Sequence, residues 1–251
     1  MIKTLDKKLI KKRFEKSLPT YADNAVVQKQ MAVNLLSELI KYRGRQFENI
    51  LDIGCGCGFL TENILNNLTC DNLFINDMVE EAVNKTADFS RKIKKIYGDC
   101  ETISFPANLD LIISNATFQW IFDFEELADK IHSSLKKDGI LAFTTFGELN
   151  LSQMKSLTGK GLKYYRKSDI EKILDKKFEI IYSHSDIINI EFKNTIDMLK
   201  HLKFSGANSI EETKWSKKDL ADFVKEYEKF KNKTGKVELT YQPLYFIARK
   251  K

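Results

Sequence analysis

The chain has 251 residues, of which 43% are hydrophobic and 30% charged, and its formal net charge is +6 at pH 7. This length and composition are sufficient for a complete hydrophobic core, in one large domain or in one domain with a small accessory element. No apolar run reaches the roughly 20 residues of a membrane span, and the lysines alternate with acidic residues, so we expect neither a membrane nor a nucleic acid as partner.

The first 45 residues predict helices. Apolar residues recur at helical spacing from Ile2 to Phe14 and from Met31 to Ile40, and we expect Pro19 to break the helix between them. Lysines interrupt the N-terminal apolar residues, so the stretch lacks the continuous apolar segment of a secretory signal. The four cysteines form no C-x-x-C pair, and the three histidines are scattered. We therefore expect a cytoplasmic protein with reduced thiols and no metal site.

From residue 49 onward, strand-like apolar runs alternate with helical patterns. Strands are predicted over 49–54, 72–77, 94–99, 109–116, 139–146, 178–190 and 237–250. Helices are predicted over 58–67, 79–89, 124–137, 170–177, 194–204 and 216–231. Gly139 is expected to cap the third of these helices, and Ser168 to open the fourth with a capping box.

This alternation predicts an α/β fold with a mostly parallel, seven-stranded sheet and helices on both of its faces. We expect a single domain over residues 1–251 with three parts. They are an N-terminal helical cap (1–45), a core (46–190 and 236–251) and a helical lid insertion (191–235) that interrupts what would otherwise be a hairpin.

The segment ILDIGCGCGFLT, residues 50–61, contains the spacing G-x-G-x-G. It is not the dinucleotide fingerprint G-x-G-x-x-G, because position 59 is Phe, and no Lys-Ser or Lys-Thr follows as in a phosphate-binding loop. A tight glycine turn of this kind suits a ligand that approaches the backbone closely and carries no pyrophosphate. S-adenosylmethionine is such a ligand.

The segment resembles motif I of class I methyltransferases, which have a Rossmann-like fold. The resemblance implies that Gly54, Gly56 and Gly58 contact the methionine portion of S-adenosylmethionine, and that Asp52 helps to bind its amino group.

Two further acidic residues follow predicted strands. Asp77 ends the second strand, where a carboxylate can accept hydrogen bonds from both ribose hydroxyls, and Met78 beside it is expected to form an apolar wall for the adenine. Asp99 follows the third strand and is expected to accept from the adenine amino group, with the Cys100 backbone nearby. Because parallel strands end at one edge of a sheet, these acids are expected to lie together.

The segment SNATFQWIF, residues 114–122, follows the fourth strand and helps to define the methyl acceptor. We assign Asn115 to cofactor binding. No proline follows it, whereas a proline follows this position in enzymes that methylate exocyclic amines of bases. C5 methylation of a base would require a cysteine in this segment, and none is present. The remaining acceptors are small molecules and carrier-bound acyl groups.

A narrower resemblance extends over almost the whole chain. Residues 13–32, 114–121, 161–174, 204–210 and 239–250 are similar to the matching segments of malonyl-acyl-carrier-protein O-methyltransferases of biotin biosynthesis. The resemblance implies esterification of the free carboxylate of malonyl-acyl-carrier protein or malonyl-CoA, at the start of pimeloyl synthesis. S-adenosylmethionine would be the donor and S-adenosylhomocysteine the product. An acidic acyl carrier protein would be the partner, and we expect the enzyme itself to be a monomer.

This resemblance also implies roles for residues near the acceptor. Tyr21 and Gln28 lie in the segment expected to fold over the cofactor, with the Tyr21 hydroxyl near the sulfonium or the acceptor. Gln119 is expected to donate a hydrogen bond to the malonyl carboxylate, and Trp120 to exclude water. A carboxylate is already ionised at pH 7, so no general base is required.

Three residues later in the chain are assigned to the substrate. Tyr165 and Arg166 precede the helix predicted at 170–177, and Arg166 is expected to pair with the acceptor carboxylate or the carrier phosphate. Asn208 lies in the segment FSGAN, which is expected to form a lid turn.

Two alternatives remain open from the residues alone. One is a methyltransferase for another small carboxylate or for a quinone precursor, although a ring-carbon acceptor would need a base near Gln119 and none is evident. The other is a catalytically silent protein that binds the cofactor. A disrupted glycine turn or ribose acid would favour the second alternative, and neither is disrupted here.

Overall fold

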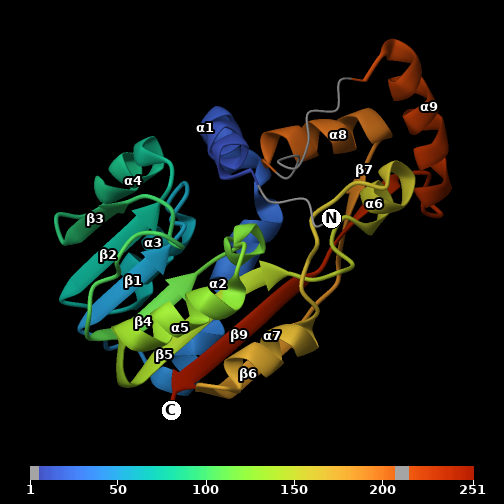
Figure 1. The fold of residues 1–251 in the computed structure, drawn as a ribbon. Coiled ribbons are helices and arrows are strands. Elements are labelled where there is room, and N and C mark those ends of the chain that lie inside the picture. The colour runs from blue at the N-terminus through green and yellow to red at the C-terminus, as the bar shows by residue number, and fades with distance from the viewer. Residues whose placement is uncertain (1–5, 207–214) are drawn as a thin grey trace.

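A computed structural model describes residues 6–206 and 215–251. Its main sheet has seven strands in the order β3-β2-β1-β4-β5-β9-β6 (Figure 1). The strands are β1 (Asn49–Ile53), β2 (Asn72–Asp77), β3 (Ile93–Tyr97), β4 (Leu109–Ser114), β5 (Leu135–Phe146), β6 (Phe178–Ser185) and β9 (Pro243–Lys250). β1 to β5 are parallel, and β9 runs antiparallel to β5 and β6. The predicted seven-stranded, mostly parallel α/β fold is confirmed.

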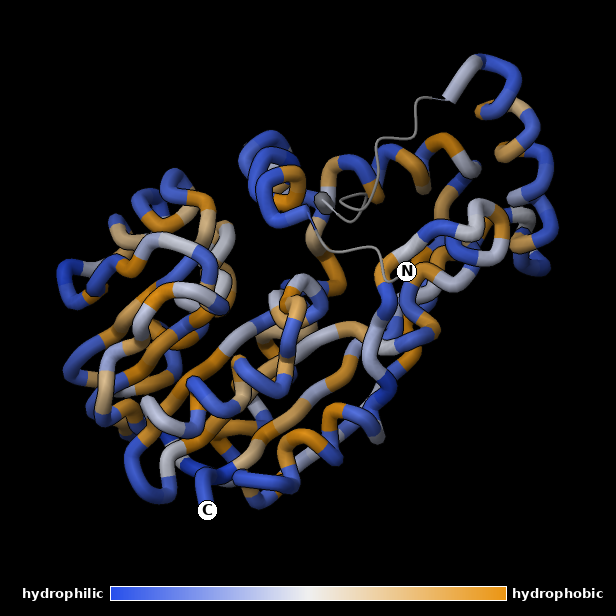
Figure 2. Tube along the Cα trace, in the orientation of Figure 1, coloured by the Kyte–Doolittle hydropathy of each residue, from blue (hydrophilic) through white to orange (hydrophobic). Residues whose placement is uncertain are grey.

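Helices cover both faces of the sheet because the central strands are apolar on both sides. Leu111 and Ile113 of β4 belong to one hydrophobic cluster, and Ile112 between them belongs to the other. The first cluster packs under α2 (Val26–Arg43), α3 (Phe59–Asn67) and α4 (Glu80–Ala87), and the second under α5 (Phe124–Ser134) and α7 (Lys167–Leu174). Figure 2 shows the resulting hydrophobic strands between helices with hydrophilic outer surfaces.

The remaining elements lie at the carboxyl ends of the strands. They are α1 (Lys7–Asn24), the short helix η1 (Phe118–Trp120), α6 (Ser152–Thr158), β7 (Ile188–Phe192), α8 (Thr195–Phe204), α9 (Lys217–Tyr227), η2 (Glu228–Phe230) and β8 (Val237–Tyr241). β7 and β8 pair antiparallel in a separate two-stranded sheet, and α1 contacts α8 (Figure 1). The boundaries of the cap, core and lid insertion stay a prediction.

Several local predictions were wrong. α1 continues through Pro19 and ends at Asn24, and its side chain Phe14 packs edge-to-face on Trp120. α5 ends at Ser134, and Gly139 lies within β5, because the buried Leu135 already pairs with β4. In each case a tertiary contact of the segment outweighs the local signal.

The predictions of a capping box at Ser168 and of two long strands were also wrong. α7 begins one residue earlier, at Lys167, without a side-chain cap, so Ser168 is helical. The apolar runs 178–190 and 237–250 each divide into two strands, β6 with β7 and β8 with β9. β7 and β8 leave the main sheet and pair with each other in the two-stranded sheet.

None of the helices among the residues described combines the length and the hydrophobicity needed to cross a membrane.

The glycine turn after β1 directs the chain sharply from strand to helix. Gly54, Gly56 and Gly58 all have positive φ, at 73°, 50° and 81°. The Gly54 and Cys55 N–H groups both donate to the carbonyl of Asn76 in β2, at 2.8 and 2.9 Å. Glycine is required here because positive φ strains other residues.

Replacing Gly54 by alanine tests how closely this turn is packed. A Cβ there would lie 2.1 Å from Oγ1 of Thr117, whereas a Cβ at Gly44, which also has positive φ, would meet nothing within 4 Å. We expect Gly54→Ala to lower the free energy of unfolding by about 1–3 kcal/mol more than the control Gly44→Ala, because only the first overpacks. Urea unfolding measures both values, and equal losses would contradict this account of the turn.

Candidate active site

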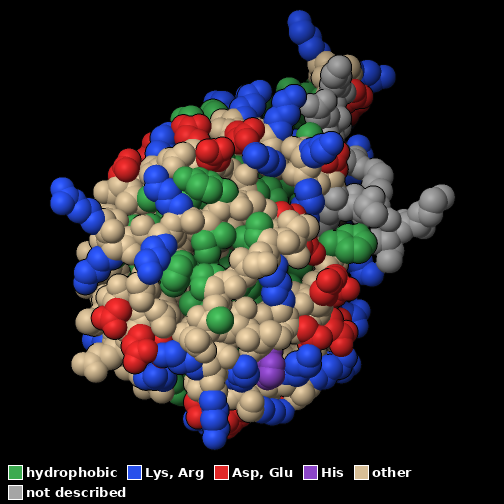
Figure 3. Space-filling view, turned by 60° about the vertical axis from the view of Figure 1, so that its left-hand side comes forward, with side chains coloured by type: hydrophobic (Ala, Val, Ile, Leu, Met, Phe, Trp, Pro, Cys, Tyr) green, Lys and Arg blue, Asp and Glu red, His purple; other side chains and the backbone are tan. Residues whose placement is uncertain are grey.

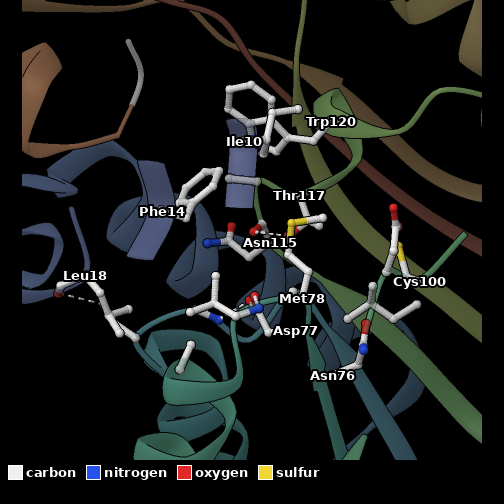
Figure 4. A pocket seen from close by; sticks show the side chains of 18 of the residues that line it. Ile10, Phe14, Leu18, Asn76, Asp77, Met78, Cys100, Asn115, Thr117 and Trp120 are labelled. Atoms are coloured by element: carbon white, nitrogen blue, oxygen red, sulfur yellow. Dashed lines mark hydrogen bonds between the residues drawn. The ribbon is translucent and has the colours of Figure 1, made fainter. Parts of the chain in front are cut away.

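A cleft opens at the carboxyl ends of β1, β2 and β4, beneath α1. Its empty space, counted out to the open mouth, is about 770 Å³. Figure 4 shows Ile10 and Phe14 of α1 with Trp120 on one side of the cleft, and Asp77 and Met78 on the other. Of the residues predicted from the sequence, the lining includes Tyr21, Gly54, Gly56, Asp77, Met78, Asp99, Cys100, Asn115 and Trp120.

Asp77 is held rigidly against the glycine turn. Its Oδ2 accepts from the Gly56 N–H at 3.0 Å, and its Oδ1 accepts from the Val79 N–H at 2.8 Å. Burial raises the pKa of this carboxyl group, while the backbone N–H donors oppose the rise. The result is a fixed acceptor at the end of β2, facing the cleft.

Asp52 lies behind the turn and does not line the cleft. It is fully buried, and its Oδ2 accepts from the Thr61 hydroxyl at 2.6 Å, which joins β1 to α3. Its Oδ1 is buried without a hydrogen-bond partner among the described residues. Burial is the main cause that raises the pKa of Asp52 to about 7, and the charge of Asp77 adds to it.

The third predicted acid is tied to α1. Asp99 forms an ion pair with Nζ of Lys7 at 3.1 Å, and Glu101 contacts the same ammonium group. Sequence reasoning missed Lys7, since it lies 92 residues from Asp99 and no local pattern marks it. It also missed Asn76, whose Nδ2 donates to the carbonyls of Ile96 and Gly98 and so fixes the loop after β3.

Asn115 connects three elements at the centre of the site. Its Nδ2 donates to the carbonyl of Gln28 at 2.9 Å, and its Oδ1 accepts from the Thr144 hydroxyl at 2.7 Å. Both ends of the Asn115 amide therefore help to position α2 and β5 around the cleft.

A second, smaller cavity adjoins the cleft, and we call it the chamber. Its lining consists of Phe14, Tyr21, Gln28, Ala116, Gln119, Trp120, Phe146, Asn150, Leu151, Leu162, Tyr164, Ser205, Gly206 and Tyr241. Phe14, Tyr21, Ala116 and Trp120 line both cavities, so these residues form the boundary between them. The structure thus brings Tyr21, Gln28, Gln119 and Trp120 together, as the sequence analysis expects.

Gln119 is oriented by two contacts within the chamber wall. Its Nε2 donates to the carbonyl of Ala116 at 2.5 Å, and its Oε1 accepts from the Thr145 hydroxyl at 3.3 Å. One N–H of the amide remains available for a ligand.

The structure does not bring the other predicted substrate residues to these cavities. Tyr165 packs on Phe124, and the exposed Arg166 pairs with Glu148 at 3.0 Å. The tyrosine that lines the chamber is the neighbouring Tyr164. Asn208 lies outside the described residues, and Gly58 caps α3 without lining the cleft.

The cleft fits S-adenosylmethionine. A Cβ at Gly56 would project into open space, so the bare backbone there leaves room for a ligand to approach. Asp77 offers a fixed carboxylate for ribose hydroxyls. The predicted direct contact of Asp52 with the amino group is not supported, because Asp52 is fully buried behind the turn. Apolar side chains of Ile10, Met78 and Trp120 complete the walls.

The raised pKa of Asp52 makes stability depend on pH. Between about pH 4 and pH 7 the folded carboxyl keeps a proton that the unfolded one has lost, so its contribution to the free energy of unfolding falls as pH rises. We expect Asp52→Asn to remove about 2–3 kcal/mol of this decline between pH 5 and pH 7.5. Urea unfolding at pH 5 and 7.5, without ligand, compares the two slopes. Because Asp77 titrates in both proteins, identical slopes would mean that Asp52 is not the group responsible.

The chain matches known methyltransferases. A family model described as a methyltransferase domain matches residues 51–143. The chain is 39% identical to a malonyl-acyl-carrier-protein O-methyltransferase of Calditerrivibrio nitroreducens, with 96% of each chain covered. It is 33% identical to the protein of that name in Acinetobacter baylyi, with 100% of this chain and 99% of the relative covered.

Solved structures share the fold at much lower identity. The YcgJ protein of Bacillus subtilis has a TM-score of 0.63 at 14% identity, covering 87% of this chain and 98% of that one. The N-methyltransferase NodS of Bradyrhizobium japonicum, in complex with S-adenosylhomocysteine, has a TM-score of 0.53 at 14% identity, covering 88% and 86%. The full-length relatives decide the family. The chain belongs to the malonyl-acyl-carrier-protein O-methyltransferases, and it is an S-adenosylmethionine-dependent methyltransferase of class I.

Proposed function

We propose that this enzyme methylates the free carboxylate of malonyl-acyl-carrier protein, with malonyl-CoA as the small analogue of that substrate. The products are the malonyl methyl ester and S-adenosylhomocysteine. Relatives of this name align with nearly the whole chain, including the segments that build the cleft and the chamber. The bound cofactor supplies an activated methyl group on a sulfonium.

One observation about the chamber carries this proposal. Among the described residues that line it, none is Asp, Glu, His, Lys, Arg or Cys, so no side chain there acts as a base near neutral pH. An acceptor that must lose a proton, such as a ring carbon of a quinone precursor, would need such a base. A carboxylate needs none because it is already ionised.

The apolar walls favour the same reaction. A carboxylate oxygen forms a bond to the methyl carbon while the electrons of the carbon–sulfur bond stay on sulfur, so a negative and a positive charge both disappear. Water would stabilise the charged reactants more than the transition state, because charge is lost on the way to products. Exclusion of water by Phe14 and Trp120 weakens this stabilisation. Alignment of the two reactants then supplies several kcal/mol more.

The predicted cofactor residues take the following proposed roles. Asp77 accepts from the ribose hydroxyls, Met78 contacts the adenine, and Asp99 accepts from the adenine amino group with the Cys100 backbone nearby. The glycine turn holds the methionine portion, and Asp52 supports the turn from behind through its hydrogen bond with Thr61. Gln28 and Asn115 act by positioning, since Asn115 donates to the Gln28 carbonyl. Tyr21 and Trp120 close the boundary between cofactor and acceptor.

The proposed partner is an acidic acyl carrier protein. Figure 3 shows lysine and arginine side chains dispersed among acidic ones around an apolar hollow, without a continuous basic block on that face. The exposed Lys155 and Lys203 line a larger groove beside the chamber and are candidates for steering the carrier. We also infer that the enzyme is a monomer and that it lies in the cytoplasm. The four free cysteines support the second inference.

Methyl transfer to three acceptors in parallel tests the function. With labelled S-adenosylmethionine, we expect the wild-type enzyme to form methyl esters on malonyl-acyl-carrier protein and malonyl-CoA, and at least about tenfold less on free malonate, because malonate lacks the thioester arm. Acetyl-CoA, which lacks the carboxylate, is the blank. Failure to esterify either malonyl thioester would refute the proposal.

Salt dependence tests the carrier partner. Raising NaCl from 50 to 300 mM should lower kcat/KM for malonyl-acyl-carrier protein several-fold more than for malonyl-CoA, since screening weakens long-range attraction between proteins. The double variant Lys155→Ala/Lys203→Ala should reduce this difference. Lys137→Ala, in an exposed lysine at the opposite end of β5, is the matched control. An equal salt response of the two substrates would argue against steering by charge.

A further inference from the structure

The chamber contains two tyrosine hydroxyls that none of the roles above uses. We propose that Tyr164 and Tyr241 bind the acceptor carboxylate as neutral hydrogen-bond donors, and so form the carboxylate-recognition site of this enzyme. The inference rests on the proposed function, because it identifies the groups that select a carboxylate over an uncharged acyl end.

Tyr164 is fixed in a geometry that leaves its proton free. Nδ2 of Asn150 donates to the Tyr164 hydroxyl oxygen at 2.8 Å, and the Gln242 N–H donates to Oδ1 of the same asparagine at 3.3 Å. The second contact fixes which end of the amide faces the tyrosine. Since the hydroxyl oxygen accepts from Asn150, its own O–H remains a donor for a ligand in the chamber.

Tyr241 is held by a different set of contacts. Its hydroxyl lies 2.8 Å from Nε2 of His201, and its ring packs edge-to-face on that imidazole and against Phe146. Burial lowers the pKa of His201, so the imidazole is neutral at pH 7. With its proton on Nε2, the imidazole donates to the tyrosine oxygen. Ser205, which also lines the chamber, is hydrogen-bonded to the same hydroxyl, so a ligand accepts a hydrogen bond from Tyr241 in exchange for this contact.

Burial keeps the tyrosine hydroxyls of the chamber protonated. It is the main cause that raises the pKa of Tyr241; the hydrogen bond with Ser205 lowers this pKa, and Tyr164, Tyr21 and Tyr227 raise it. Burial likewise raises the pKa of Tyr164 to about 12. Both tyrosines therefore keep their protons at neutral pH and act as donors.

Neutral donors suit a carboxylate that must react as a nucleophile. A cation such as arginine would stabilise the carboxylate charge in the ground state, and this stabilisation would be lost as the oxygen bonds to carbon. Hydroxyl donors orient the carboxylate but stabilise its charge less, so less stabilisation is lost as the oxygen bonds to carbon. This explains why Arg166, paired with Glu148 at the surface, is not needed in the chamber.

The chamber is also placed to receive the end of a long substrate. On the side away from the cofactor cleft, Asn150, Leu151, Leu162 and Tyr164 also line the larger groove between α6, α8 and α9. A thioester arm leaving by that side would keep the carboxylate end at the boundary formed by Tyr21 and Trp120.

Phenylalanine variants test this site, because they remove one oxygen and keep the ring. We expect Tyr164→Phe and Tyr241→Phe each to raise the Kd of malonyl-CoA at least tenfold, in calorimetric titrations of the enzyme saturated with S-adenosylhomocysteine. The affinity for acetyl-CoA, which has no carboxylate, should change less than twofold. KM for malonyl-CoA should rise with its Kd.

Tyr227→Phe is the matched control. Tyr227 is as fully buried as Tyr241, and its hydroxyl donates to the Glu238 carbonyl at 2.9 Å, outside the chamber. Its variant should retain the wild-type Kd for malonyl-CoA. Unchanged malonyl-CoA binding in both chamber variants, or equal weakening of malonyl-CoA and acetyl-CoA, overturns the inference. Absence of methyl ester with the wild-type enzyme would instead refute the proposed function, so the two failures are distinct.

Discussion

The left-handed backbone after β1 is the constraint on which the site depends. Three glycines with positive φ let the chain turn from strand to helix while its N–H groups bond to β2. The turn places Gly56 beside Asp77 and leaves its surface bare toward the cleft. Thr117 packs directly over Gly54, so the loop after β4 is positioned by the same turn. The proposed cofactor cleft and the loop after β4 therefore share one structural origin.

The second organising feature is α1, which closes the cleft from above. Lys7 pairs with Asp99 at one end of the cleft, and Phe14 packs on Trp120 at the other. Each contact joins residues about a hundred positions apart in the chain, so the cleft is completed only when the N-terminal helix docks on the finished sheet. The aromatic contact also separates the cleft from the chamber.

The two cavities differ in their electrostatic character, and the difference matches their proposed ligands. The cleft presents the carboxylates of Asp77 and Asp99, which suit the hydroxyls, amines and positive charge of the cofactor. The chamber presents amides and hydroxyls on an apolar background, without a charged side chain among its described lining residues. A negatively charged acceptor thus meets donors but no competing anion, and lies next to the positive sulfonium.

Local sequence signals predicted the sheet, the glycine turn and the strand-end acids, because strand periodicity, positive φ and the shared edge of parallel strands are all encoded within short segments. They failed at Pro19, Gly139 and Ser168, where packing outweighs the propensity of a few residues.

Adjacent residues show the same limit at the site. The sequence pointed to Tyr165, but neighbouring side chains point in different directions, and only the packed loop turns Tyr164 into the chamber. Tyr241 and His201, like Asn150 and Tyr164, meet through folding of separate segments. The sequence by itself thus determined the fold class and the sheet edge at which we propose that the cofactor binds. Only the tertiary structure decided which side chains surround the acceptor, because those contacts depend on long-range packing.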